Sequence, residues 1–128
     1  MRLTPSLAEL TGGSEERRSS AEKAAAKLAA ELRENKAQLD EHEFQLKHEL
    51  GAVEIRRGPL SIARVVFNFG DSGKARVFSE VLGEPGEWLR SEDFVDADEA
   101  IAAFKKTLYN ATIAFHKRRD EFRALGLI

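Results

Sequence analysis

Apolar residues recur at helical spacing in two long segments, one toward each end of the chain, and this pattern constrains the fold most. In the first segment they step by four and three residues from Ala21 to Leu46, which forms a heptad stripe. Ser14 is a suitable N-cap, and Gly51 is a suitable residue to end a helix. We therefore predict a long helix over residues 14–50, too long to bury its stripe on a small sheet alone.

A second stripe lies near the C-terminus. Asp96 and Glu99 have the spacing of a capping box, and apolar residues then step by three and four from Ile101 to Leu125. This stripe contains three phenylalanines, so its apolar side chains are larger than those of the first stripe. It predicts a second long helix over residues 97–125.

This second helix also has a separate apolar patch, formed by Ala102, Tyr109 and Ile113, more than a quarter turn away from the stripe. A helix with two apolar patches has two surfaces to pack against other elements. We expect the sheet to take one patch and a helix to take the other.

The segment between the helices has the composition of β-strands. Residues 61–69 are rich in β-branched and aromatic side chains, residues 70–73 form a turn signal, and residues 74–82 predict a returning strand. Shorter candidate strands lie at residues 52–56 and 87–90.

Alternation within the first of these strands predicts which side chains share a face. Val65 and Phe67 point to one face, and Ile62 and Val66 point to the other. Both faces are apolar near the centre of the strand, so we expect both to be covered. For residues 44–57, the sequence is compatible with either a helix or a strand.

These elements predict an α+β fold with a long N-terminal helix, a short antiparallel β-hairpin or three-stranded meander, and a long C-terminal helix. A chain of 128 residues fits one domain, and we assign residues 14–128 to it. Residues 1–13 are expected to form a flexible N-terminal arm, because Thr11, Gly12 and Gly13 interrupt its helical spacing.

Two heptad stripes on so small a chain would expose a large apolar surface unless a partner covers them. We therefore predict self-association through the helices. Asn35 is a polar residue in the first stripe, and a polar residue at such a position fixes register in coiled coils. The candidate oligomer seam comprises Leu28, Leu32, Asn35, Leu39, Phe104, Leu108 and Phe115.

Several kinds of chemical site are disfavoured by the residues present. The chain has no cysteine, which removes disulfides, thiolate zinc sites and cysteine nucleophiles. His42 and His48 are six residues apart, so a helix would not align them as a metalloprotease motif requires. Acidic residues from Glu92 to Glu99 complement the start of a helix rather than form an acid–base pair. We therefore expect no catalytic residues, no metal and no cofactor.

The chain lacks a long apolar run, so we expect neither a membrane helix nor a secretory signal, and the cytoplasm is the expected location.

The formal net charge is -2 at pH 7. Such a charge provides no overall attraction to nucleic acid, so binding of nucleic acid would require a local basic patch.

The predicted function is a non-catalytic, homo-oligomeric protein-interaction module: an adaptor, regulator or inhibitor that binds a protein partner through its surface, with no small-molecule substrate. The alternative is a dimeric DNA-binding protein, because the helix–sheet–helix architecture is similar to that of small nucleoid-associated proteins. A dimer would double any basic patch, including one formed by Arg64 and Arg76 across the hairpin. The candidate partner or nucleic-acid surface comprises Arg64, Arg76, Lys117, Arg118 and Arg119.

Overall fold

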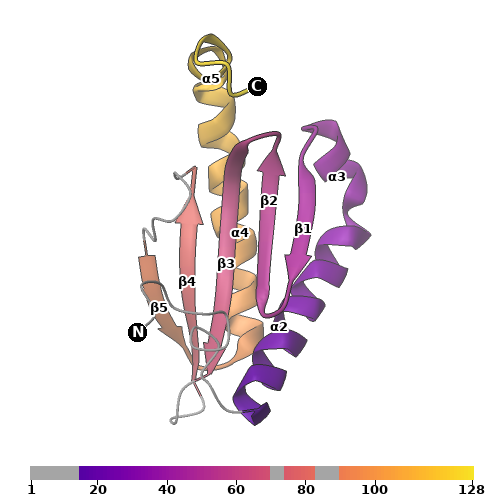
Figure 1. Cartoon of the computed structure of the whole chain (residues 1–128), viewed down its shortest axis with the longest axis vertical. Coiled ribbons are helices and arrows are strands. Elements are labelled where there is room, and N and C mark those ends of the chain that lie inside the picture. Colours follow the sequence, from indigo (N-terminus) through magenta and orange to yellow (C-terminus); the bar gives the residue numbers. More distant parts are fainter. Residues whose placement is uncertain (1–14, 70–73, 83–89) are drawn as a thin grey trace, which may run out of the picture.

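The computed structural model, shown in Figure 1, has a five-stranded antiparallel sheet with its two main helices packed against the same face. The structure describes residues 15–69, 74–82 and 90–128. The expected N-terminal arm and the expected turn at residues 70–73 therefore lie outside the described residues. The elements in chain order are α2 (Glu15–Glu34), α3 (Lys36–Glu41), β1 (Gln45–Glu49), β2 (Ala52–Arg57), β3 (Leu60–Phe69), β4 (Ala75–Val81), β5 (Arg90–Phe94), α4 (Ala97–Lys117) and α5 (Arg119–Ala124).

The α+β class is confirmed, but a hairpin or three-stranded meander understates the sheet. The strands follow each other in chain order, β1-β2-β3-β4-β5, and each pair is antiparallel. The two strands at the edges are short and polar, which is common for edge strands and gives little β signal in a sequence. Of the candidate strand at residues 87–90, only Arg90 lies in the described part, where it begins β5.

The first helix ends well before residue 50, so the prediction of one helix over residues 14–50 is wrong. It breaks at Asn35, resumes as α3 and stops after Glu41. Glu43 then adopts a positive φ of 58°, and the chain turns into β1. Antiparallel pairing of β1 with β2 satisfies the backbone of this segment and overrides its helical spacing. His48, expected at a helix end, therefore lies on an edge strand.

The prediction that both faces of the central strand are covered is confirmed. Val65 and Phe67 are fully buried on the face that carries the helices. Val66, whose side chain points to the opposite face, is also buried. Ile62 stands at a β-bulge and belongs to the same core cluster as Val65 and Phe67, so its assignment to the opposite face is not supported. β3 is therefore the centre of the fold, paired with β2 on one side and β4 on the other.

The main stripes of the helices pack on this sheet. Stripe residues Leu28, Leu32, Leu39, Phe104 and Phe115 are all buried in the core of the single chain. Within one chain they therefore belong to the core, although Leu32 and Leu39 also line the open groove described below. Their part in an oligomer seam stays a prediction.

Asn35 and Leu108 behave differently from the rest of that seam. Asn35 is exposed and stands at the break between α2 and α3, where its side-chain amide donates a hydrogen bond of 3.1 Å to the carbonyl oxygen of Glu31. Leu108 is partly buried at the edge of the core. Neither side chain occupies a coiled-coil position.

The second helix begins where the capping box predicts. The side chain of Asp96 accepts a hydrogen bond of 2.9 Å from the backbone N–H of Glu99. The helix breaks at Arg118, so residues 97–125 form two helices, α4 and α5, rather than one. This break turns Phe122 onto Phe115, with the two rings stacked 5.9 Å apart, and keeps both buried.

Truncation of a core phenylalanine should destabilise the protein strongly. Phe115 is fully buried, so we expect Phe115→Ala to lower the free energy of unfolding by about 3–5 kcal/mol in urea denaturation. Leu125, which is 65% exposed, provides the matched control. If Leu125→Ala costs as much as Phe115→Ala, this assignment of the core is incorrect.

Candidate functional site

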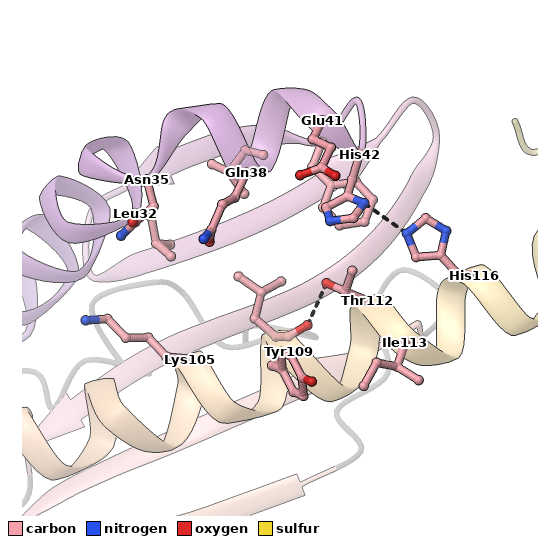
Figure 2. Close-up of a pocket in the computed structure, with 13 residues that line it drawn as sticks. Leu32, Asn35, Gln38, Glu41, His42, Lys105, Tyr109, Thr112, Ile113 and His116 are labelled. Atoms are coloured by element: carbon pink, nitrogen blue, oxygen red, sulfur yellow. Dashed lines mark hydrogen bonds between the residues drawn. The ribbon is translucent and has the colours of Figure 1, made fainter.

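An open groove separates α2–α3 from α4 on the outer side of the helical layer (Figure 2). Its volume is about 580 Å³, within the range of ligand-binding pockets. One wall is formed by α2, α3 and the residues that follow, and the other by α4. The lining residues are Leu32, Asn35, Gln38, Leu39, Glu41, His42 and Phe44 from the first wall, and Lys105, Leu108, Tyr109, Thr112, Ile113 and His116 from the second.

Contacts across the groove show that the two walls run parallel and in register. Lys27 forms an ion pair with Asp98, 71 residues later. Lys105 donates a hydrogen bond of 2.7 Å to Glu31, a separation of 74 residues. His42 and His116, also 74 residues apart, share a hydrogen bond at the other end. Residues that differ in number by about 71–74 therefore lie at the same height on opposite walls.

Most of the exposed surface of the groove is apolar, although seven of its thirteen lining residues are polar, and several of these polar groups are already engaged. Thr112 donates its hydroxyl hydrogen bond to the carbonyl oxygen of Leu108 at 2.8 Å, and the amide of Asn35 is engaged with Glu31. The groove therefore offers shape and apolar contact more than polar recognition.

A histidine pair joins the two walls at the end of the groove near α5. His42 Nδ1 and His116 Nε2 lie 2.9 Å apart, and Figure 2 shows the rings pointing toward each other. Arg57 from β2 donates a hydrogen bond of 2.8 Å to the backbone carbonyl of His42 and forms an ion pair with Glu43. Within the described residues, no third histidine, aspartate or glutamate joins the pair to form a metal-binding cluster.

The surroundings of His116 disfavour its charged form. Loss of water around the packed ring lowers the pKa of His116 below its ordinary value of 6.5. The nearby groups His42, Arg119 and Arg57 lower it further, and only the carboxylate of Glu41 acts in the opposite direction. The pair is thus most stable when His116 is neutral.

The second apolar patch of the last helix remains exposed. Tyr109 is 68% exposed and Ile113 is 41% exposed, and Ala102 is exposed as well. The neighbouring helix, expected to cover this patch, lies on the far side of the groove instead. Figure 2 shows Tyr109 and Ile113 on the outer rim of the α4 wall, pointing away from α3. This arrangement leaves a large apolar surface without an intramolecular partner among the described residues.

Two of the basic candidates lie on the sheet face opposite the helices. Arg64 is aligned with Glu54 on β2 and with Glu80 on β4, so it does not face Arg76 as expected. Arg76 forms a bidentate pair with Asp93 of β5, at 2.7 and 3.1 Å. Carboxylates therefore accompany both arginines. Glu92 and Asp93, predicted to belong to the start of the helix, are strand residues.

The other basic candidates lie at the junction of α4 and α5. Lys117 and Arg118 are exposed there, whereas Arg119 is partly buried. Arg118 forms an ion pair with Glu121 at 2.8 Å and covers the ring of Phe122 at 4.6 Å. The structure thus places the five candidates in two separate groups and does not join them into one patch.

Sequence reasoning missed both the groove and the histidine pair. His42 and His116 are far apart in the chain, and no local motif connects them. The available signal was the second apolar patch on the last helix. Tyr109 and Ile113 of this patch line the groove, but spacing does not identify the residues of the opposite wall.

Comparison with protein-family models, with curated proteins and with solved structures finds no significant match. In the described part of the chain, no helix combines the length and the apolar character needed to cross a membrane. The interpretation of the site therefore depends on its own geometry.

Protonation of His116 should weaken the fold. Because its pKa is lower in the folded chain, the unfolded chain binds the proton more readily. The stabilisation from His116 is complete above the ordinary pKa of about 6.5 and is lost as the pH falls from there toward the lowered pKa. We expect urea denaturation to show a decrease in unfolding free energy from pH 7.5 to pH 5.5, which His116→Gln reduces.

Leu125→Ala is the control for this measurement, because it changes an exposed residue that carries no titratable group. It should leave the pH dependence unchanged. In an NMR titration the pKa of His116 should lie below the ordinary value of 6.5, and a value above 6.5 would contradict this account of the pair.

Proposed function

We propose that the protein is a non-catalytic, homo-oligomeric interaction module that acts through the outer surface of its helical layer. The observation that carries this proposal is the exposed pair Tyr109 and Ile113 on the rim of the groove. Isolated apolar residues on a surface are ordinary. These two are neighbours on one helix face, and they border an apolar groove, which is the pattern of an interaction site.

The nature of the groove favours binding over catalysis. It combines apolar side chains such as Leu32, Leu39 and Phe44 with polar groups engaged in internal hydrogen bonds. Helix-in-groove recognition uses such a surface, with large side chains from a partner helix seated between two walls. An adaptor, a regulator and an inhibitor all fit this mode of action.

A dimeric DNA-binding protein of the nucleoid-associated type has less support. Of its five candidate residues, Arg76 and Arg118 form ion pairs with acidic neighbours, and Arg64 stands between two glutamates in the sheet register. Phosphate binding would have to compete with these carboxylates. The exposed apolar patch also has no role in that alternative.

Light scattering at micromolar concentration tests the proposal. We expect a mass of at least twice 14.3 kDa. The double variant Tyr109→Ser/Ile113→Ser should be folded and monomeric, because it removes the apolar contact while its own side chains are largely exposed. Leu50→Ser, at a 60% exposed leucine on the β1–β2 turn, should keep the wild-type mass.

A monomeric wild-type protein under these conditions would refute self-association. Retention of the protein on immobilised DNA that weakens steeply with salt would instead favour the nucleic-acid alternative.

A further inference from the structure

Each wall of the groove carries a stripe of exposed residues, and the two stripes have the same spacing. Of these residues, Glu41, Tyr109 and Ile113 line the groove itself. The α2–α3 stripe consists of Ala30, Glu34, Ala37 and Glu41, with steps of four, three and four residues. The α4 stripe consists of Ala102, Lys106, Tyr109 and Ile113, with the same steps, and continues to Lys117. Every one of these side chains is exposed, and residues at such steps share one face within α4. On the first wall, Ala30 and Glu34 belong to α2, and Ala37 and Glu41 belong to α3, on either side of the break at Asn35.

The stripes also lie at the same height along the groove. Ala30 and Ala102 differ by 72 in number, as do Glu34 and Lys106, Ala37 and Tyr109, and Glu41 and Ile113. The pairs that bridge the walls within one chain differ by 71 to 74. Each residue of one stripe is therefore level with its counterpart on the opposite wall.

We propose that this face binds a second copy of the chain, related by a two-fold axis that runs along the groove. Rotation about such an axis exchanges the two walls but leaves the height of every residue unchanged. The α2–α3 stripe of one copy therefore meets the α4 stripe of the other in register. Glu34 faces the partner's Lys106, Ala37 faces the partner's Tyr109, and Glu41 lies beside the partner's Ile113 and the partner's Lys117.

Shape supports this pairing. The α2–α3 stripe presents small alanines between its carboxylates, whereas the α4 stripe presents a tyrosine and an isoleucine between its lysines. Small residues allow the larger side chains of the opposite stripe to approach closely. Burial of Tyr109 and Ile113 supplies the hydrophobic stabilisation, and two-fold symmetry provides it twice.

Charge selects the orientation of the axis. Residues 31–41 contain four carboxylates and two cationic side chains, whereas residues 100–117 contain three lysines and no carboxylate. An axis along the groove places the acidic wall of each copy against the basic wall of the other. An axis across the groove would place like walls together, with acid facing acid and base facing base, and electrostatic repulsion disfavours that arrangement.

This arrangement depends on the proposed self-association and specifies its geometry. Cysteine cross-linking tests it cleanly, because the natural chain contains no cysteine. Two single variants are needed, Ala30→Cys and Ala102→Cys, both at exposed alanines where a thiol adds little volume. A mixture of the two, treated with an oxidant or a short bis-maleimide, should give a covalent dimer that contains one chain of each variant.

Each variant alone should give little covalent dimer, because the two-fold axis keeps identical positions on opposite sides of the groove. Efficient cross-linking of Ala30→Cys to itself would show that like walls meet and would overturn the arrangement. Light scattering separates the two proposals. A monomeric wild-type chain refutes self-association, whereas an oligomer in which the mixed variants do not cross-link refutes only the geometry.

A charge exchange provides a second, independent test. Glu34→Lys and Lys106→Glu each create two like-charge contacts per dimer, so each should raise the dissociation constant about tenfold at low salt. The double variant restores both pairs, as does an equimolar mixture of the two single variants, and both should return to within about twofold of wild type.

Arg33→Glu is the matched control. It reverses the charge of an exposed residue on the same helix but outside the stripe, and it should leave the dissociation constant unchanged. If the dissociation constant of the double variant is as high as that of the single variants, Glu34 does not face the partner's Lys106.

Discussion

The interaction on which the structure depends is the burial of two helical stripes on one face of the sheet. The Ala and Leu stripe of α2 and the Phe stripe of α4 both pack over the central strand β3, whose Val65 and Phe67 are fully buried. Packing of both helices on the same face places them side by side and parallel. This leaves their outer sides as one continuous surface, and the groove lies along its middle.

The helices are held mainly by the sheet rather than by each other. The contacts between them are the ion pairs Lys27–Asp98 and Lys105–Glu31 and the hydrogen bond His42–His116, and the side chains of both ion pairs keep substantial exposure. Exposed ion pairs contribute little stability. They join residues that lie at the same height on the two walls, a level that the packing of both helices on the sheet has already set.

The two walls of the groove differ in their charged residues. The chain is nearly neutral overall, yet residues 31–41 carry more carboxylates than cationic side chains, whereas residues 100–117 carry three lysines and no carboxylate. An asymmetric surface of this kind is self-complementary under only some rotations. In the proposed dimer, burial of the exposed Tyr109 and Ile113 favours association, whereas the charges favour one orientation. The basic residues of the sheet, which sit among carboxylates, take no part in this scheme.

Local sequence determined the elements whose signals are local: the start of α4 at Asp96, the β3–β4 hairpin, the apolar character of both faces of β3, and the two patches of the last helix. Tertiary structure decided the rest. The pairing of β1 with β2 ended the first helix at Glu41, although its apolar spacing continues to Leu46, because backbone hydrogen bonds in the sheet outweigh a helical pattern. The groove and the pair His42–His116 arose from packing between segments distant in the chain. No spacing rule reaches that far, because only the sheet fixes which residues of the two helices lie level.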